Sequence, residues 1–313
     1  MKRLMLSIIT PAHNEAANLS LLVEKIDLIV SKITNRFEII VVDDGSTDGS
    51  LNLLLKLKKK HPSLKIIRLR RQSGQTAGIM AGFMHSSGEI VVVLDADLQQ
   101  DPNDIKKLIE PIVVGEADVV SGNRQKRQHL LIYRFIARVE SILNKWLLGI
   151  SLSDTSVSPN AYHRKTLKNI HLYGEMHRFL VPILYWRGFK VIEIPVNHFK
   201  RHAGTSNYKP TKAIRGLLDL LVIKFWQDYS SRPIHLFGTA GLLLMLAGTV
   251  LGIEEAVRKL VFGLSIFNRT LPLLAAFLFI VGIQFLIFGI LADILIRLYY
   301  KENDTYQVEE IIE

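Results

Sequence analysis

The first part of the chain, up to about residue 125, alternates short apolar runs with stretches of helical periodicity. The apolar runs are short enough for strands, and this alternation is typical of a parallel α/β sheet. In such a sheet the functional side chains lie at the carboxyl ends of the strands. We expect strands over Leu4–Thr10, Phe37–Asp43, Leu64–Leu69, Ile90–Asp95 and Asp118–Ser121, and helices over Leu19–Ile33 and Leu51–Lys60.

Two longer apolar runs follow in the last third of the chain. Residues 233–253 and 272–292 each hold 21 residues without Asp, Glu, Lys or Arg, enough for a helix to cross roughly 30 Å of hydrocarbon. Buried core helices of a soluble domain are the alternative, but two successive runs joined by a short polar loop favour a membrane hairpin. The preceding residues 211–229 fit an amphipathic helix at the membrane interface or a plain core helix equally well.

Basic residues gather just before the first apolar run. They are Lys200, Arg201, Lys209, Lys212, Arg215, Lys224 and Arg232, whereas the connecting loop carries Arg258, Lys259 and Arg269. Because positive charge is retained on the cytoplasmic side, we expect the large N-terminal part and both termini in the cytoplasm. The predicted organisation is a cytosolic domain over 1–210, a juxtamembrane amphipathic helix over 211–232, a transmembrane region over 233–300 with spans at about 233–253 and 272–296, and a cytosolic tail over 301–313.

Composition narrows the chemistry that the chain can perform. None of the 313 residues is cysteine, which excludes disulfides, thiolate zinc sites, iron–sulfur clusters and a cysteine nucleophile. The net charge of +10 would suit nucleic acid, anionic lipid or a phosphorylated substrate. Nucleic acid is disfavoured, because the basic residues gather beside the apolar runs rather than along a soluble face.

Polar clusters follow three of the predicted strands, at residues 11–15, 43–48 and 95–99. Asp95, Asp97 and Gln99 alternate, so an extended backbone would project their oxygens to one side, and such ligands suit Mg²⁺ or Mn²⁺. A solvated acidic turn that caps the next helix is the alternative. In the second cluster a carboxylate could bind a nucleobase or ribose, while Ser46 or Thr47 caps the following helix. The three clusters predict one shared crevice.

Two common phosphate-binding motifs are missing from the sequence. No G-x-G-x-x-G follows the first strand, and no Walker A sequence is present. Gly74, Gly78 and Gly82 have helical spacing, which favours close helix packing over a phosphate cradle. His177, His198 and His202 contain no i, i+4 pair, so packing or phosphate contact is favoured over a metal cluster.

The ordered motifs resemble a known family. Pro-Ala-His-Asn-Glu at 11–15, Asp-Asp-Gly-Ser-Thr-Asp at 43–48 and Asp-Ala-Asp-Leu-Gln at 95–99, followed by Asp-Pro, are similar to the inverting family 2 glycosyltransferases of the GT-A fold. Residues 174–180, 201–208 and 232–238, placed before two spans, resemble the polyprenyl-phosphate glycosyltransferases, which include dolichol-phosphate mannose synthases and bactoprenol glucosyltransferases. The resemblance covers essentially the whole chain and implies a GT-A domain followed by interfacial helices and two transmembrane helices.

The resemblance also implies roles for individual residues. It implies that the nucleotide is bound by Pro11, His13, Glu15, Asp43 or Asp44, and Asp95, and that the divalent ion is bound by Asp95, Asp97 and Gln99. Catalysis is assigned to Asp97, Asp154, Arg124 and Arg138. The acceptor phosphate is assigned to Arg178, Arg201, Tyr208 and Lys209. For the basic residues a solvated face is the alternative, but the bidentate geometry of Arg favours phosphate capture beside a membrane.

The reaction implied is inverting transfer of a hexose from a UDP- or GDP-sugar to the phosphate of a polyprenyl phosphate. That phosphate has a second pKa of about 6, so we expect Asp154 to orient groups rather than to remove a proton. Gly238, Gly241, Gly248 and Gly252 could support helix contacts within or between subunits of a homo-oligomer. The alternatives are a membrane-tethered nucleotide-sugar sensor or scaffold without turnover, and a processive polysaccharide synthase, which would need a Q-x-x-R-W motif and more spans.

Overall fold

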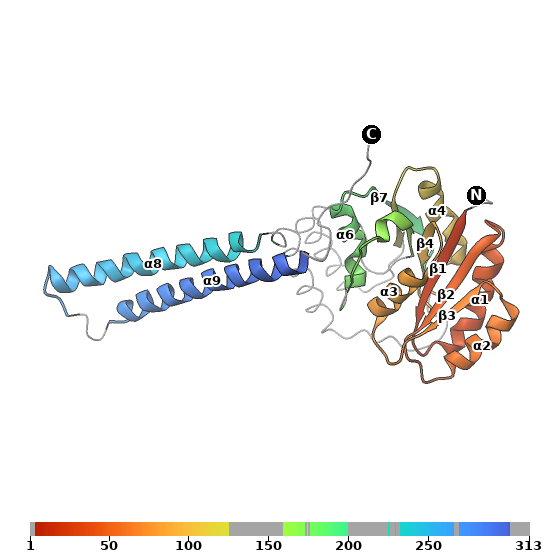
Figure 1. Ribbon diagram of the computed structural model, residues 1–313, viewed down its shortest axis with the longest axis horizontal. Coiled ribbons are helices and arrows are strands. Elements are labelled where there is room, and N and C mark those ends of the chain that lie inside the picture. The colour runs from red at the N-terminus through yellow and green to blue at the C-terminus, as the bar shows by residue number, and fades with distance from the viewer. Residues whose placement is uncertain are drawn as a thin grey trace. The chain divides into compact units, whose positions relative to one another are not determined.

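The chain forms two units, Met1–Leu220 and Leu221–Glu313. The structure, a computed structural model, describes residues 4–124, 159–172, 174, 176–199, 225, 229, 232–265 and 269–300. Figure 1 shows that the first unit is built around a sheet and that the second contains a hairpin of two long helices.

A seven-stranded sheet forms the centre of the first unit, in the order β3-β2-β1-β4-β6-β5-β7. The strands are β1 (Met5–Ala12), β2 (Arg36–Asp43), β3 (Leu64–Arg68), β4 (Ile90–Val93), β5 (Val119–Arg124), β6 (Asn160–His163) and β7 (Val191–Val196). The pairs that β1 makes with β2 and β4 are parallel, and so are the pairs β2–β3 and β5–β7. The five predicted strands therefore form, and the prediction of a mostly parallel sheet is confirmed.

The sequence pattern predicts neither the edge strand β7 nor the inner strand β6. Strand β6 pairs antiparallel with both β4 and β5, so the sheet is mixed. Its four residues are too few for a periodicity to emerge. Ala161 and Tyr162 are buried, and Ala161 lies opposite Val92 on one side and Val120 on the other. Tertiary pairing, rather than local pattern, makes this segment a strand.

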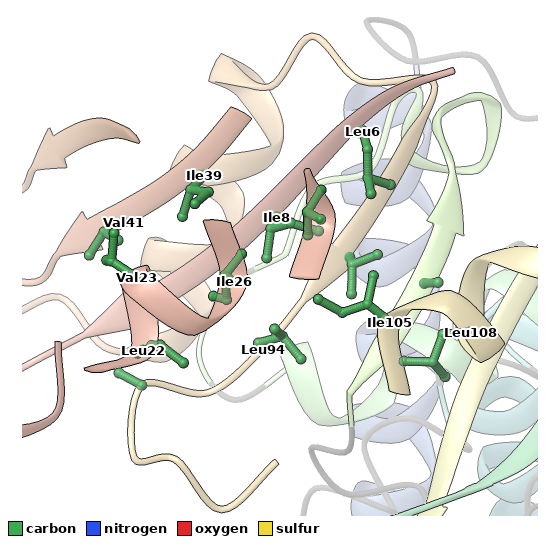
Figure 2. Close-up of a cluster of buried hydrophobic side chains, with 14 of the residues drawn as sticks. Leu6, Ile8, Leu22, Val23, Ile26, Ile39, Val41, Leu94, Ile105 and Leu108 are labelled. Atoms are coloured by element: carbon green, nitrogen blue, oxygen red, sulfur yellow. The ribbon is translucent and has the colours of Figure 1, made fainter. Parts of the chain in front are cut away.

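Helices cover both faces of the sheet (Figure 1). They are α1 (Ala16–Val30), α2 (Ser50–Lys60), α3 (Gln75–His85), α4 (Ile105–Val113) and α6 (Leu180–Trp186). Successive side chains of a strand point to opposite faces, so Ile39 and Val41 of β2 join one core with α1, α2 and α4, while Ile40 and Val42 join the other with α3 and α6. Figure 2 shows the first of these cores.

Two glycines let α3 lie close to β1. A Cβ on Gly82 would be 2.4 Å from Cγ2 of Ile9, and one on Gly78 would be 3.0 Å from Cβ of Pro11. The prediction that this glycine series permits close packing is confirmed for Gly78 and Gly82, whereas nothing lies within 4 Å of a Cβ built on Gly74, which has φ +93°. The first turn of α3 is thereby held against the carboxyl end of β1.

The second unit contains α8 (Ile234–Leu260) and α9 (Leu271–Tyr300). The segments Ile234–Leu260 and Leu271–Ile296 are long and apolar enough to cross a membrane, and only 17% of the most apolar window of each is buried. Exposed side chains such as Leu242, Leu246 and Phe277 fit an apolar surrounding better than the interior of a soluble domain. Both predicted spans therefore form as helices. Of the predicted segment 211–232, only residues 225, 229 and 232 are described, and the tail 301–313 lies outside the described residues.

Small residues bring α8 and α9 into contact. A Cβ on Gly241 would lie 2.7 Å from the carbonyl oxygen of Gly282, and one on Gly248 would lie 2.7 Å from that of Ala275. Side chains at these positions would push the helices apart, so these two glycines serve contacts within the chain. Gly252 differs, because nothing lies within 4 Å of a Cβ built there.

Candidate active site

The carboxyl ends of β2, β1 and β4 lie side by side, because these strands are parallel neighbours in the sheet. Hydrogen bonds join the segments that follow them. The amide of Asp44 donates to the carbonyl of Ala12 over 2.8 Å, and that of Leu94 donates to Ile9 over 2.9 Å. The amide of Thr47 donates to Oδ1 of Asn14 over 2.8 Å. The sheet thus gathers the three predicted polar clusters at one edge.

Asp43 is the last residue of β2 and is fully buried. Its Oδ1 accepts a hydrogen bond from the amide of Ser46 at 3.1 Å. Its Oδ2 has no hydrogen-bond partner among the described residues. A buried polar atom without a partner is costly, so the structure leaves a place for a donor from a bound molecule.

The neighbouring Asp44 has a different role. Its two carboxylate oxygens accept hydrogen bonds from the amides of Ser73 and Gly74, at 2.6 and 2.9 Å. These bonds hold the loop before α3 against the strand end. Gly45 permits the approach, because it has φ +63° and a Cβ there would lie 2.6 Å from the nitrogen of Gln72. Of the two carboxylates that the sequence offers for the nucleotide, the geometry favours Asp43.

Asp48 caps the adjoining helices. Its Oδ1 accepts from the amide of Ser50 at 3.0 Å, and its Oδ2 accepts from the amide of Ala16 at 3.0 Å. Burial opposes ionisation of this carboxyl, but the hydrogen bonds from Ser50 and Ala16 outweigh burial and lower its pKa. The prediction that Ser46 or Thr47 caps α2 is therefore wrong, since both bond to Asn14 instead.

The residues predicted at the end of β1 are tied to the same edge. Nδ1 of His13 lies 2.7 Å from the carbonyl oxygen of Asp44, so Nδ1 carries the proton and donates it. Glu15 precedes α1, and its carboxylate accepts from Nδ2 of Asn18 at 2.6 Å. Pro11 lies opposite Val42 in the register of β1 and β2. Pro11 and His13 thus lie against the neighbours of Asp43, whereas the carboxylate of Glu15 is held at the start of α1.

Asp95 is held between two glutamines. Its Oδ1 accepts from Nε2 of Gln75 at 2.9 Å, and its Oδ2 accepts from Nε2 of Gln100 at 2.8 Å. The amide of Asp95 donates in turn to Oε1 of Gln100 at 3.0 Å. Neither glutamine was among the predicted site residues. The sequence could have indicated Gln75, because it is the first residue of α3 and directly follows Gly74, the N-cap of that helix.

The backbone after β4 is not extended as predicted. The strand ends at Val93, residues 96 and 97 form a turn, and Leu98 has φ +59°. Oδ1 of Asp97 accepts from the amide of Gln99 at 3.1 Å, which closes the turn as aspartates commonly do. The alternating projection of Asp95, Asp97 and Gln99 is therefore wrong, although all three remain within one short loop.

The donor chemistry of this loop fits a hard divalent ion. Asp97 is buried, with 8% of its surface exposed, and carboxylates are the ligands that Mg²⁺ and Mn²⁺ prefer. Within the described ranges no three His, Asp or Glu side chains converge on one point. Mg²⁺ sites in proteins commonly use one or two carboxylates together with substrate phosphates and water.

The chain after β7 lies beside the same loop. The amide of Phe199 donates to the carbonyl of Gln99 over 2.8 Å, and His198 forms a bridge with Gln100. The amide of Asn197 donates to Oδ2 of the buried Asp104 over 2.7 Å. The segment that leads to Arg201 therefore starts next to Asp97.

The first turn of α3 makes a second connection. Oγ1 of Thr76 donates to the carbonyl of Gly174 over 2.6 Å, and the same Oγ1 lies 2.6 Å from Nδ1 of His177. His177 belongs to the short 3-10 helix Met176–Phe179, which also contains the half-buried Arg178. Thr76 is next to Gln75 in sequence, so this segment and the Asp95 loop share one support. The expectation that His177 packs rather than ligates a metal agrees with this contact.

Several predicted site residues are not placed by the structure. Asp154, Arg138, Arg201, Tyr208 and Lys209 lie outside the described residues, and so does His202. Arg124 is the last residue of β5, a strand that pairs with β6 and β7. The assignments of catalysis and acceptor binding to these residues stay predictions.

Comparison with known proteins places the chain in a family. The sequence model for glycosyl transferase family 2 matches residues 7–167. Dodecaprenyl-phosphate galacturonate synthase from Rhizobium johnstonii is 32% identical, and the match covers 100% of this chain and 94% of that protein. Undecaprenyl-phosphate 4-deoxy-4-formamido-L-arabinose transferase from Photorhabdus laumondii is 30% identical over 98% of this chain and 94% of its own length.

Solved structures show the same fold. Glucosyl-3-phosphoglycerate synthase from Mycobacterium tuberculosis, in a complex with Mn²⁺, UDP and its product, matches with a TM-score of 0.57 and 17% identity, over 71% of this chain and 80% of that chain. The prediction of a GT-A domain followed by two apolar helices is confirmed. The chain belongs to glycosyl transferase family 2.

Proposed function

We propose that this glycosyltransferase moves a sugar from a nucleotide-sugar donor to the phosphate of a membrane polyprenyl phosphate, with inversion at the anomeric carbon. Relatives that match along nearly their whole length act on dodecaprenyl phosphate and undecaprenyl phosphate, as their names state. Both the α/β unit and the two apolar helices lie within the matched length. The names of these relatives specify galacturonate and a formamido-arabinose as their sugars, so the sugar of the donor need not be a neutral hexose.

The observation that carries the proposal is the buried Oδ2 of Asp43, which has no partner among the described residues. A nucleoside offers N–H and O–H donors that would satisfy this oxygen. The oxygen lies at the end of a strand next but one to β4 in the sheet, and the loop after β4 carries Asp97. The nucleoside would therefore bind across β1, with its diphosphate directed toward Asp97.

Asp97, helped by Asp95, would hold the divalent ion, Mg²⁺ or Mn²⁺. When bound there, the ion supplies positive charge to the diphosphate that leaves the sugar. Gln75 and Gln100 hold the Asp95 carboxylate in a fixed orientation. Gln99 would support the same site through its backbone, whose amide and carbonyl tie Asp97 to the segment after β7.

The acceptor phosphate would attack the anomeric carbon directly. A phosphate with a second pKa of about 6 is largely ionised near neutral pH, so the reaction needs no strong general base. Arg178, Arg201, Tyr208 and Lys209 would bind the acceptor phosphate, because guanidinium and ammonium groups stabilise phosphate charge. Asp154 would orient the reacting groups, and Arg124 and Arg138 would contact the sugar or the diphosphate.

Helices α8 and α9 would anchor the enzyme where its acceptor lies. Two spans leave both termini on one side of the membrane, and the basic residues before Ile234 favour the cytoplasmic side. The nucleotide-sugar donor is a soluble cytoplasmic molecule in this arrangement. The lipid acceptor would present its phosphate at the same surface.

A donor screen tests the proposal. Full-length protein would be incubated with Mn²⁺ or Mg²⁺, a polyprenyl phosphate and a panel of UDP- and GDP-sugars that includes a uronic acid and a formamido-arabinose. We expect a lipid-linked sugar by mass and release of the nucleoside diphosphate, both lost with EDTA and in Asp97→Asn. Asp27→Asn is the control, since Asp27 pairs with His61 at the surface of α1. Donor binding without release across the panel would instead support a sensor or scaffold.

A further inference from the structure

A groove opens between α8 and α9 at the end of the hairpin where residues 261–270 connect them. The groove has a volume of about 520 Å³ and is lined mainly by small and apolar residues, among them Gly248, Gly252, Ala275 and Phe279. The helices touch at Gly248, where a Cβ would meet the backbone of α9, and diverge by Gly252, where a Cβ would meet nothing within 4 Å. The groove is therefore a wedge that begins one turn beyond the closest contact.

One buried carboxylate lines this groove. The side chain of Glu255 is 5% exposed, and its Oε1 accepts from Arg269 at 3.1 Å. Its Oε2 is buried and has no hydrogen-bond partner among the described residues. The adjacent Glu254 is very different, because it is 47% exposed and is bound by Arg258 at 2.8 Å. Among the described residues that line the groove, only Glu255 offers a buried carboxylate oxygen without a partner.

The groove lies at the depth of lipid headgroups if α8 spans a membrane. Glu255 is 21 positions after Ile234 (255 minus 234), which corresponds to about 32 Å along a helix. This distance is close to the roughly 30 Å thickness of the hydrocarbon core. The wedge would therefore place its apolar walls among acyl chains and Glu255 at the polar boundary.

The charges at this boundary suit a phosphate group. Lys259 also lines the groove and is exposed. With Arg258 and Arg269 it gives three cations against the two carboxylates Glu254 and Glu255, so one positive charge remains to attract a phosphate. A molecule with an apolar tail, a phosphate and an N–H donor would fill the groove, meet Lys259 and satisfy Oε2 of Glu255.

We propose that this groove binds one phospholipid with a primary amine headgroup, of the phosphatidylethanolamine class. Its ammonium would donate to Oε2 of Glu255, its phosphate would face Lys259, and the upper part of one acyl chain would lie in the space beside Gly252. Phosphatidylcholine has no N–H to donate, and phosphatidylglycerol offers neutral hydroxyls, whose hydrogen bonds to a carboxylate are weaker than those of an ammonium. A helix from a second copy would bring apolar side chains and leave Oε2 without a partner.

Lipid retention by the full-length protein tests this proposal. The chain would be equilibrated with equal amounts of phosphatidylethanolamine, phosphatidylcholine and phosphatidylglycerol in detergent, and native mass spectrometry would read the bound lipid and the oligomer mass. We expect about tenfold preference for phosphatidylethanolamine over phosphatidylcholine, the size of one hydrogen bond to a charged group. Glu255→Gln should lose this preference, whereas Glu254→Gln should keep it.

A second variant distinguishes a loss of lipid binding from a folding defect. Gly252→Leu places a side chain in the open side of the wedge, at a position where a Cβ has no atom within 4 Å. We therefore expect it to reduce lipid retention while its helical circular dichroism and its glycosyl transfer match the wild type. Equal retention of the three lipids, or an unchanged preference in Glu255→Gln, would overturn the proposal. A change of oligomer mass in Gly252→Leu with no lipid retained would show instead that a second copy fills the groove.

Discussion

Each unit of the molecule contains a buried carboxylate with one oxygen that lacks a partner among the described residues, Asp43 Oδ2 and Glu255 Oε2. The two differ in what holds the other oxygen. Oδ1 of Asp43 accepts a hydrogen bond from the neutral backbone amide of Ser46, whereas Oε1 of Glu255 accepts one from the charged guanidinium of Arg269. Sheet register places the first at a strand end, and helix packing places the second beside a wedge. The same missing hydrogen-bond donor therefore indicates a nucleoside in one unit and a lipid headgroup in the other.

The largest effect is expected from a substitution at Asp97. Replacing this carboxylate removes a charge from the α/β unit and leaves the hairpin unchanged, so the two sites are tested separately. Asp97→Asn should reduce glycosyl transfer about a hundredfold to a thousandfold, the usual loss when one group that stabilises transition-state charge is removed. Lipid retention by the hairpin should not change. Initial rates with saturating donor, with Asp27→Asn as control, would measure this, and transfer near the wild-type rate would remove Asp97 from the catalytic site.

Adjacent aspartates give the next test, because Asp43 and Asp44 differ only in their partners. Asp43→Asn should weaken donor binding by about tenfold to a hundredfold, which is the range of a hydrogen bond to a charged group. Asp44→Asn should instead lower the thermal midpoint, because one of its two bonds to the loop before α3 is lost. Calorimetric titration with nucleoside diphosphate and a melting curve would separate the two effects. Equal donor affinity in Asp43→Asn and wild type would contradict the nucleotide assignment.

In the hairpin, two glycines one turn apart make a similar pair. Gly248→Leu places a Cβ 2.7 to 2.8 Å from the backbone of Ala275 and Phe279 and should destabilise the helix pair by about 1–3 kcal/mol through overpacking. Gly252→Leu should leave that stability unchanged. Thermal loss of the helical circular dichroism signal in detergent measures both, and equal midpoints would show that the helices do not pack as described.

The smallest effect is expected from pH and concerns the α/β unit. Burial, followed by the charge of Lys165, lowers the pKa of His163 below its ordinary value of 6.5. The unfolded chain therefore takes up this proton at a higher pH than the folded chain does. Stability from this group is complete above about pH 6.5 and declines as the pH falls toward the folded pKa. His163→Asn should reduce the loss of thermal midpoint between pH 7 and 5.5, and an unchanged slope would exclude His163 as its source.

Much of the fold followed from sequence because its signals are local. The five predicted strands and both apolar helices each carry a continuous pattern, and the polar clusters stand directly after strands. Strand β6 was missed because only its pairing with β4 and β5 makes it a strand. Strand β7 was missed because Pro195 interrupts its apolar run, and a strand tolerates proline there only because it lies at the edge of the sheet. The turn at residues 96 and 97 was missed because the Asp97 side chain closes it, and alternation of polar residues alone does not reveal a turn.

The site was less predictable at the level of individual partners. Asp43 and Asp44 are identical in sequence terms, and only the position of the loop at Ser73 and Gly74 distinguishes them. Gln75 and Gln100 approach Asp95 from different elements, so no spacing links all three. Glu255 and Glu254 are likewise equivalent until the packing of α9 buries one of them.

The central claim is that the acceptor phosphate attacks the sugar. Polyprenyl phosphate labelled with ¹⁸O in its phosphate, incubated with the full-length protein and the active donor, tests this directly when both products are analysed by mass. The account predicts that all of the label stays in the lipid-linked sugar and that the released nucleoside diphosphate is unlabelled. Label in the released nucleoside diphosphate would mean that a labelled oxygen had bonded to the donor β-phosphorus and displaced the sugar alkoxide, which then attacked the lipid phosphorus and broke its bond to that oxygen. The C1–O bond of the donor would then have stayed intact, which would contradict the proposed reaction.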